Sequence, residues 1–319
     1  MAVCIRTHNV ESGYQMIKPI DRGEGRMNGG IYIVRQRRSG QTFVEKRIKP
    51  SEINIGRREI EILHGLEPHE GIVRCYEAFL TKSPPAAALY FEWCDLGNLL
   101  CFIERFSAYG IHIPEQFIWH TFHTLACALS YLHFGIRDPT TPSRPNNRWH
   151  TVLHRDIKPA NVFLKSRGGA SRGITSAYPR VVLGDFGLST RMGMGDFPDN
   201  GEYVGTMRWQ PPELPYHSCR GEVWSLGAVI HSMCHLDEGP VSRPPHGIKE
   251  RVWCELPEAR RPLKLNPAVY TRELSEVLGM CLRFQKNERP MATELVLALQ
   301  LLARRSGCSF VPLPAWAFD

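Results

Sequence analysis

Short apolar runs separated by turn residues dominate the first part of the chain. Runs of this kind, rich in β-branched and aromatic residues, predict β-strands, here over 31–34, 42–48, 71–80 and 87–93. One stretch interrupts them, because residues 52–66 carry apolar side chains at helical spacing, with Ser51 as the expected N-cap. The N-terminal part is therefore expected to be a small β-sheet with one helix.

Beyond Gly97 the spacing of apolar residues becomes helical. The stretch 117–134 predicts a long helix, and residues 222–305 are mostly helical in pattern. Apolar runs between these segments predict brief strands over 152–154, 162–164 and 181–183. The second part of the chain is therefore expected to be mainly helical.

Together these patterns predict an α+β fold with two lobes. We expect a small antiparallel β-sheet lobe at 17–93, a hinge at 94–97 and a larger helical lobe at 98–305. Residues 1–16 are expected to be an N-terminal extension and residues 306–319 a C-terminal tail.

Composition narrows the function classes. The 319 residues are 43% hydrophobic and 22% charged, which is ordinary for a globular protein with a full core. No apolar run reaches the ~18 residues of a membrane span, and the N-terminus lacks the apolar stretch of a signal peptide. The ten cysteines include no C-x-x-C pair. We therefore expect reduced thiols and an intracellular protein, cytoplasmic or nuclear. No nucleic-acid-binding motif is present.

Two motifs follow predicted strands in a fixed order. HRDIKPAN occupies 154–161 and DFG occupies 185–187. Either motif arises by chance when alone, but the ordered pair, each after an apolar strand, is specific. Over residues 17–305 the sequence resembles the eukaryotic protein kinases. HRDIKPANVFL, LGDFGLS and YVGT are most similar to the NIMA-related serine/threonine kinases.

The resemblance implies transfer of the γ-phosphoryl group from ATP, with Mg²⁺, to serine and threonine residues of protein substrates. It makes Asp156 the catalytic base and lets Lys158 contact the transferring phosphate. Asn161 and Asp185 become the Mg²⁺ ligands. Lys158, two residues after the aspartate, and Thr206 favour serine and threonine over tyrosine as acceptors.

The patterns of two segments predict an ion pair between Lys46 and Glu59. Strand alternation puts Lys46 on the face of Val44 and away from Arg47. Glu59 lies in the apolar stripe of the predicted helix, where a carboxylate needs a cation. By resemblance, Lys46 holds the α- and β-phosphates of ATP. An exposed strand lysine is the alternative, because Arg47 and Lys49 are close by.

The resemblance also places the adenine pocket. Phe91 would lie at its back, Glu92 and the backbone of Cys94 would face adenine, and Ile31 and Val44 would cover the base. The backbone of Gly23, Gly25 and Gly29 would cover the phosphates, although this spacing is one residue longer than G-x-G-x-x-G.

The segment VGTMRWQPPE, residues 204–213, resembles the end of a kinase activation segment. Thr206 is expected to orient the catalytic Asp and Lys. Glu213 is expected to form a buried pair with Arg289, which would be a structural contact.

Glu202 stands where related kinases carry a threonine that is phosphorylated. We hypothesise that its carboxylate replaces the phosphate that would pair with Arg155. A solvated loop glutamate is the alternative.

Glu222 departs from the family pattern, which has Asp at a position that accepts backbone hydrogen bonds from the catalytic loop. Its extra methylene predicts a poor fit. This departure and the long glycine spacing support a pseudokinase scaffold as the alternative function. An enzyme is favoured by the intact motif residues Lys46, Glu59, Asp156, Asn161 and Asp185. A small-molecule phosphotransferase is a third reading, which the 204–213 segment disfavours.

Two polar insertions, 136–150 and 166–180, are candidates for partner docking, with solvated loops as the alternative. His120, His123 and Cys127 lie on one face of a predicted helix and could suggest a metal site. They lack a carboxylate or a second cluster, so packing is favoured.

Overall fold

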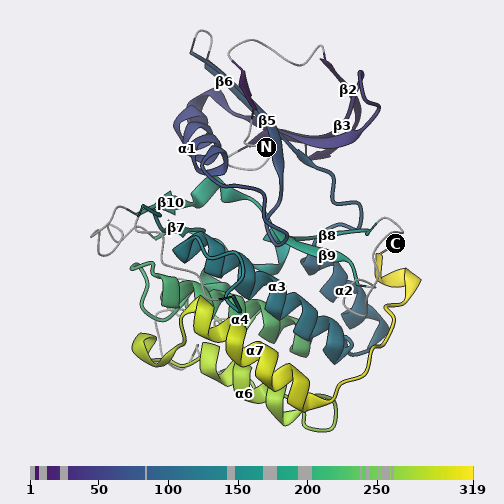
Figure 1. The fold of residues 1–319 in the computed structure, drawn as a ribbon, viewed down its shortest axis with the longest axis vertical. Coiled ribbons are helices and arrows are strands. Elements are labelled where there is room, and N and C mark those ends of the chain that lie inside the picture. The colour runs from purple at the N-terminus through teal and green to yellow at the C-terminus, as the bar shows by residue number, and fades with distance from the viewer. Residues whose placement is uncertain are drawn as a thin grey trace.

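A computed structural model describes residues 4–6, 13–21, 28–82, 85–141, 148–167, 178–192, 203–237, 239–241, 245–249, 252, 259 and 262–318. The chain forms a strand-rich lobe above a larger helical lobe (Figure 1). The predicted two-lobed α+β arrangement is therefore confirmed.

The small lobe is built on a six-stranded sheet in the order β1-β5-β6-β4-β3-β2. Neighbouring strands are antiparallel except at one edge, where β1 pairs parallel to β5. Residues 4–6, which were expected to belong to an N-terminal extension, therefore form the edge strand of the sheet. The strands are β1 (Cys4–Arg6), β2 (Tyr14–Asp21), β3 (Asn28–Gln36), β4 (Thr42–Ile48), β5 (Cys75–Lys82) and β6 (Pro85–Glu92).

One helix, α1 (Ile53–His64), covers the sheet on the side that faces the large lobe. Its buried residues Glu59, Ile62 and Leu63 lie on the face that the helical spacing predicts, and Ile60 is buried beside them. The expected N-cap is wrong. Ser51 lies in a short 3-10 turn, Pro50–Glu52, and Glu52 occupies the N-cap position without a side-chain hydrogen bond.

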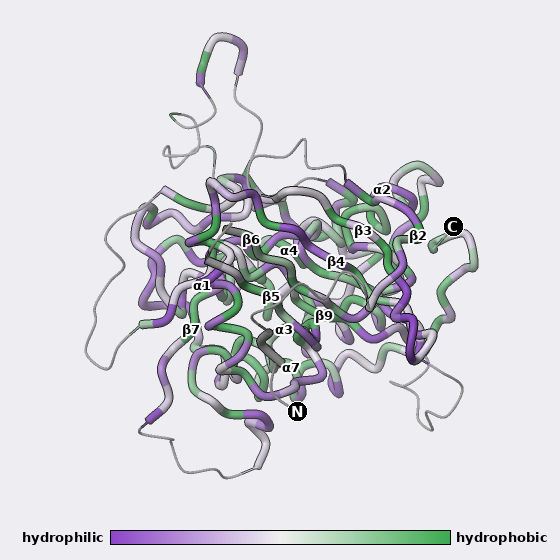
Figure 2. The backbone as a smooth tube through the Cα atoms, turned by 90° about the horizontal axis from the view of Figure 1, so that it is seen from above, coloured by the Kyte–Doolittle hydropathy of each residue, from purple (hydrophilic) through white to green (hydrophobic). Residues whose placement is uncertain are grey.

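The large lobe packs its helices around the long α3 (Glu115–Phe134). The other helices are α2 (Leu99–Tyr109), α4 (Cys219–His235), α6 (Arg272–Cys281) and α7 (Ala292–Ser306). Seen from above, hydrophobic residues gather in the middle of the molecule and hydrophilic residues on the outer loops (Figure 2). In the described part of the chain, no helix is both long and apolar enough to cross a bilayer.

Two small strand pairs lie between the lobes and carry the motif loops. β7 (Val152–Leu153) pairs with β10 (Thr190–Arg191), and β8 (Val162–Lys165) pairs with β9 (Arg180–Leu183). The HRDIKPAN segment begins directly after β7, and DFG follows β9. The two antiparallel pairs therefore bring both motifs to the same side of the large lobe, under the sheet.

Candidate active site

One face of the small-lobe sheet forms the roof of a cavity of about 580 Å³. Ile31 lies opposite Lys46 in the sheet, and Val44 lies opposite both Ile33 and Phe91. Directly opposed residues of antiparallel strands point to the same face. The register therefore explains why all five line the cavity.

The rest of the lining comes from the hinge and the large lobe. Buried Cys94 and neighbouring Asn98 form the hinge side, and Ala160 and Phe163 lie across from the sheet. Sequence reasoning missed Ile33 and Phe163. Alternation along the strand could have predicted Ile33, because it lies two residues after Ile31 and so faces the same side. Phe163 could not be predicted in this way, because its place in the cavity depends on where the β8–β9 pair lies in the fold.

Lys46 lies between two carboxylates. Its Nζ is 2.9 Å from Glu59 Oε2 and 2.7 Å from Asp185 Oδ1. Burial alone would lower the pKa of Lys46, but the charges of Glu59 and Asp185 outweigh burial and raise it. The charge of Lys46 in turn lowers the pKa of Asp185 to about 2, against the opposing effect of burial. The predicted contact between strand and helix is present, and both its ends face the cavity.

Asp156 is held by three side chains in the loop after β7. Thr206 Oγ1 donates to Asp156 Oδ1 at 2.8 Å, and Asn161 Nδ2 donates to Oδ2 at 3.0 Å. Lys158 Nζ lies 2.8 Å from Oδ2 and donates to Thr206 Oγ1 at 2.7 Å. The predicted contacts of Thr206 with both residues are therefore present. These contacts fix the position of the Asp156 carboxyl group next to Asn161, which lines the cavity.

Glu222 fits its buried position, and the expectation of a poor fit is wrong. Its Oε1 accepts from the backbone N of Arg155 at 2.8 Å, and its Oε2 lies 2.8 Å from His133 Nε2. Arg155 has a φ of 67°, a rare conformation for a side chain other than glycine. The longer Glu side chain thus reaches two partners and supports the backbone of the motif loop.

The residues expected to bind Mg²⁺ offer a suitable set of oxygen atoms. The Asp185 side chain is 42% exposed, and its low pKa keeps it anionic. Asn161 uses its Nδ2 on Asp156, so its Oδ1 accepts no hydrogen bond within the described part of the chain. One carboxylate and one amide oxygen fit Mg²⁺, which keeps several of its waters.

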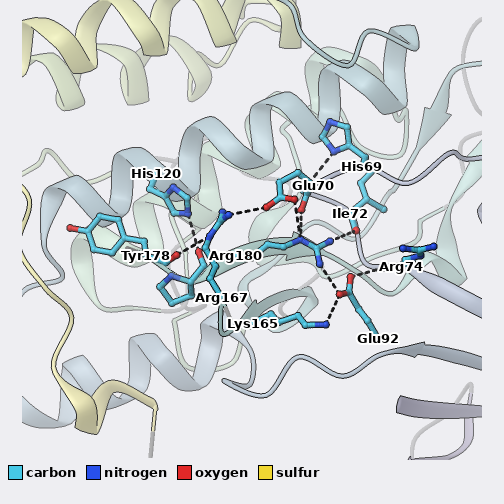
Figure 3. A network of polar contacts seen from close by, with 12 residues as sticks. His69, Glu70, Ile72, Arg74, Glu92, His120, Lys165, Arg167, Tyr178 and Arg180 are labelled. Atoms are coloured by element: carbon cyan, nitrogen blue, oxygen red, sulfur yellow. Dashed lines mark hydrogen bonds and ion pairs between the residues drawn. The ribbon is translucent and has the colours of Figure 1, made fainter. Parts of the chain in front are cut away.

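Glu92 points its carboxylate into a polar network with Arg74, Lys165 and Arg180 (Figure 3). Its Oε2 lies 2.9 Å from Lys165 Nζ and 2.7 Å from Arg180 Nη1, and Oε1 accepts from the backbone N of Arg74 at 2.8 Å. Its carboxylate therefore ties the end of β6 to β8 and β9. Glu92 also lines the nucleotide cavity, but only with atoms other than its carboxylate oxygens.

The buried pair predicted between Glu213 and Arg289 is present. Arg289 Nη1 and Nη2 each donate to one Glu213 oxygen at 2.8 Å. The guanidinium is fully buried and also donates to the carbonyls of Arg220, Arg283 and Phe284. Such a two-pronged contact with every donor used is typical of a structural cation.

Two expected sites are only partly visible. Glu202 lies outside the described residues, while Arg155 is buried and donates from Nε to Leu188 O at 2.7 Å. Gly23 and Gly25 also lie outside the described residues. Gly29 lies in β3 next to Gly30, whose φ of 127° suits glycine, at an irregular point of the strand register.

The histidine cluster on α3 makes local contacts. His120 Nε2 lies 3.0 Å from Pro179 O, and His123 Nε2 lies 3.3 Å from Gln300 Nε2. Within the described residues, no group of three or more potential ligands could hold a metal ion.

Comparison with known proteins gives a consistent picture. The model of the protein kinase domain family matches residues 14–298. The chain is 29% identical over 313 residues to the G2-specific protein kinase nim-1 of Neurospora crassa. That match covers 92% of this chain and 34% of the relative. With the G2-specific protein kinase nimA of Emericella nidulans the identity is 28%, over 89% of this chain and 40% of the relative.

A human relative is similar to the same degree. The serine/threonine-protein kinase Nek2 of Homo sapiens is 28% identical over 261 residues, which cover 80% of this chain and 50% of Nek2. The chain therefore spans half or less of the length of these three relatives.

Proposed function

Because this chain belongs to the protein kinase family, we propose that it transfers the γ-phosphoryl group of ATP to serine and threonine hydroxyls of proteins. The observation that carries the proposal is the position of Lys46. It is held between Glu59 and Asp185 under the roof of the cavity. A nucleotide whose base lies against the apolar residues of the cavity would place its phosphates near this cation.

In phosphoryl transfer, each side chain of the site has a separate role. Asp156 accepts the proton of the acceptor hydroxyl while that oxygen forms a bond to the γ-phosphorus. The bond between the γ-phosphorus and the bridging oxygen breaks, and ADP keeps the electron pair. Lys158 lies beside Asp156 and neutralises charge on the transferred group. Mg²⁺ on Asp185 and Asn161 would supply charge neutralisation at the β- and γ-phosphates.

The choice of serine and threonine rests on Lys158 and its hydrogen bond to Thr206, and on the printed names of relatives such as Nek2. We further propose an intracellular location, in the cytoplasm or nucleus. Protein substrates would reach the open side of the cavity. The insertions at 136–150 and 166–180 are proposed as partner-docking segments, although parts of both lie outside the described residues.

A labelling experiment tests the proposal. The full chain is incubated with Mg²⁺, γ-labelled ATP and casein or a random peptide library. We expect label on serine and threonine. Lys46→Met and Asp185→Asn should each reduce it about 100-fold or more, because each removes a charge at the transferring phosphates. Lys264→Met, which changes an exposed lysine, is the matched control and should keep full activity.

If no label is transferred, a thermal-shift measurement with Mg-ATP on the same samples shows whether the protein still binds the nucleotide. Stabilisation by Mg-ATP with no label on any acceptor would contradict an active kinase and favour the pseudokinase. Neither stabilisation nor label would contradict nucleotide use altogether.

A further inference from the structure

The C-terminal segment, residues 308–318, runs along α2 instead of leaving the molecule (Figure 1). Trp316 stacks on Tyr109 with ring centroids 4.1 Å apart and lies 4.8 Å from Phe106. Phe318 lies 5.7 Å from Phe102. Residues three or four apart on a helix share a face. The aromatic side chains at 102, 106 and 109 therefore lie on one face of α2. Trp316 and Phe318 pack on this face, and Tyr109 at its end stays 58% exposed.

Polar contacts fix the direction of the segment. Arg105 Nη1 donates to Ala317 O at 3.3 Å, and Ala317 is fully buried. At the other end, Tyr178 donates to Val311 O at 2.7 Å, and its ring lies 4.9 Å from Phe310. Residues Ala315–Phe318 form a short 3-10 helix, so Trp316 and Phe318 reach α2 from one turn while the Val311 carbonyl anchors the other end of the segment.

The receiving surface belongs to the core of the large lobe. Phe102 and Phe106 are buried in the main hydrophobic cluster and lie next to each other, and Phe102 also lies next to Phe117. In the covering segment, Pro312 and Pro314 fix two backbone φ angles and so limit the entropy lost on docking. One partner is thus an aromatic face of a core helix, called the α2 groove below, and the other is a short aromatic segment with two prolines.

We propose that this groove of α2, formed by Phe102, Arg105, Phe106 and Tyr109 and flanked by Tyr178, is a peptide-docking site that residues 308–318 occupy in cis. The ligand class is a proline-flanked segment with two aromatic residues in the pattern Trp-Ala-Phe. Occupation of the groove also bears on the nucleotide cavity. Asn98 caps α2 by accepting from Cys101 N at 2.9 Å, and it lines the cavity with Gly97. This second part rests on the proposed kinase function.

Peptide binding tests the docking site without any kinase assay. The full-chain variant Trp316→Ala/Phe318→Ala empties the groove. A fluorescent peptide of residues 309–319 should bind to it, and should bind the wild type at least about tenfold more weakly, because the linked segment competes at high effective concentration. A peptide with Ala in place of its Trp should not bind. Leu297→Ala/Leu301→Ala, two exposed leucines of α7, should behave as the wild type does.

Hydrogen exchange covers the case in which the double variant fails to fold. Tyr109→Ala leaves the segment intact and should speed amide exchange in 308–318. Equal binding of the peptide to wild type and a folded double variant, no binding to either, or unchanged exchange in Tyr109→Ala would overturn the docking site.

Nucleotide kinetics test the coupling to the cavity. In the double variant the KM for ATP should rise about threefold or more with little change in kcat, and the peptide added in trans should restore it. An unchanged KM in a variant that binds the peptide would overturn the coupling and leave the proposed kinase function standing.

Discussion

At the scale of single residues, the buried charges decide how the motif loop is held. His133 is fully buried against Glu222, which in turn supports Arg155. Burial opposes a charge on His133, but Cys219 and Glu222 together raise its pKa to about 10. The imidazolium therefore persists in the folded protein well above the pH at which a free histidine loses its proton.

This shift predicts how stability depends on pH. The folded pKa of His133 lies above the usual value of 6.5, so its contribution is complete below pH 6.5 and is lost as the pH rises toward 10. We expect the His133 contribution to the unfolding free energy of the wild type to fall by on the order of 5 kcal/mol over this window. Urea unfolding at several pH values would measure it.

The variant His133→Gln keeps a donor for Glu222 but does not titrate, so its stability should change less over the same window. His112→Gln, at an exposed histidine, is the control and should follow the wild type. Parallel slopes for all three proteins would contradict the prediction.

At the scale of elements, the turn after α1 is held to the large lobe by α3 and the insertion that follows it. Tyr131 of α3 accepts from Glu67 N at 2.8 Å, and His69 stacks on its ring at 5.1 Å. Arg137, at the start of the 136–150 insertion, donates to Pro68 O at 3.0 Å and pairs with Glu67. The position of α1, and with it Glu59, therefore depends on contacts outside the small lobe.

Removing one of these contacts should loosen the turn. Tyr131→Phe leaves Glu67 N without its acceptor, a loss of about 1 kcal/mol. We expect about fivefold faster amide exchange in residues 65–72, because 1.4 kcal/mol corresponds to a factor of ten. Hydrogen-exchange mass spectrometry would measure it. Tyr216→Phe, at an exposed tyrosine, serves as control. Equal amide exchange rates in the two variants would contradict a stabilising role of the hydrogen bond between Glu67 and Tyr131.

At the scale of the whole molecule, the two lobes are joined by more than the hinge. Glu92 at the end of the small-lobe sheet forms ion pairs with Lys165 and Arg180 of the large lobe. The carboxylate is 2% exposed, so solvent screens these pairs little. The network limits how freely the lobes move relative to each other on the side opposite the nucleotide.

Glu92→Gln removes the negative charge and leaves two partly buried cations facing each other. We expect a loss of stability on the order of 2 kcal/mol, measured by urea unfolding. Glu61→Gln, at an exposed position on α1, should change stability little. A Glu92→Gln protein as stable as this control would show that the network does not tie the lobes.

The sequence predicted the contacts that local pattern and motif spacing determine. Alternation along β4 and helical spacing along α1 were enough to place Lys46 opposite Glu59. The orientation of Glu92 was available from the same rule, because Phe91 faces the cavity and the next residue of a strand faces away. The family resemblance indicated that Glu92 lies at the adenine pocket, but it did not indicate that the carboxylate points away from the pocket.

Other features depend on contacts between distant segments. The partner of His133 lies 89 positions away, and the pairing of β1 with β5 joins residues far apart in sequence. The docking of the C-terminal segment joins Trp316 to Tyr109. No spacing rule identifies such partners, because only the tertiary fold brings them together. The N-cap prediction at Ser51 was wrong for a different reason, since the 3-10 turn at Pro50–Glu52 moved the helix start by one residue.

The burial of Cys94 has a consequence for inhibitor chemistry. A thiol in a nucleotide cavity invites the design of covalent inhibitors, in which an electrophile on the ligand is attacked by sulfur. Burial raises the pKa of Cys94 to about 12. At neutral pH its thiolate is therefore about a thousandfold scarcer than that of a free cysteine, and only the thiolate attacks. We therefore expect an electrophile aimed at Cys94 to react slowly and to add little to the binding of compounds directed at this cavity.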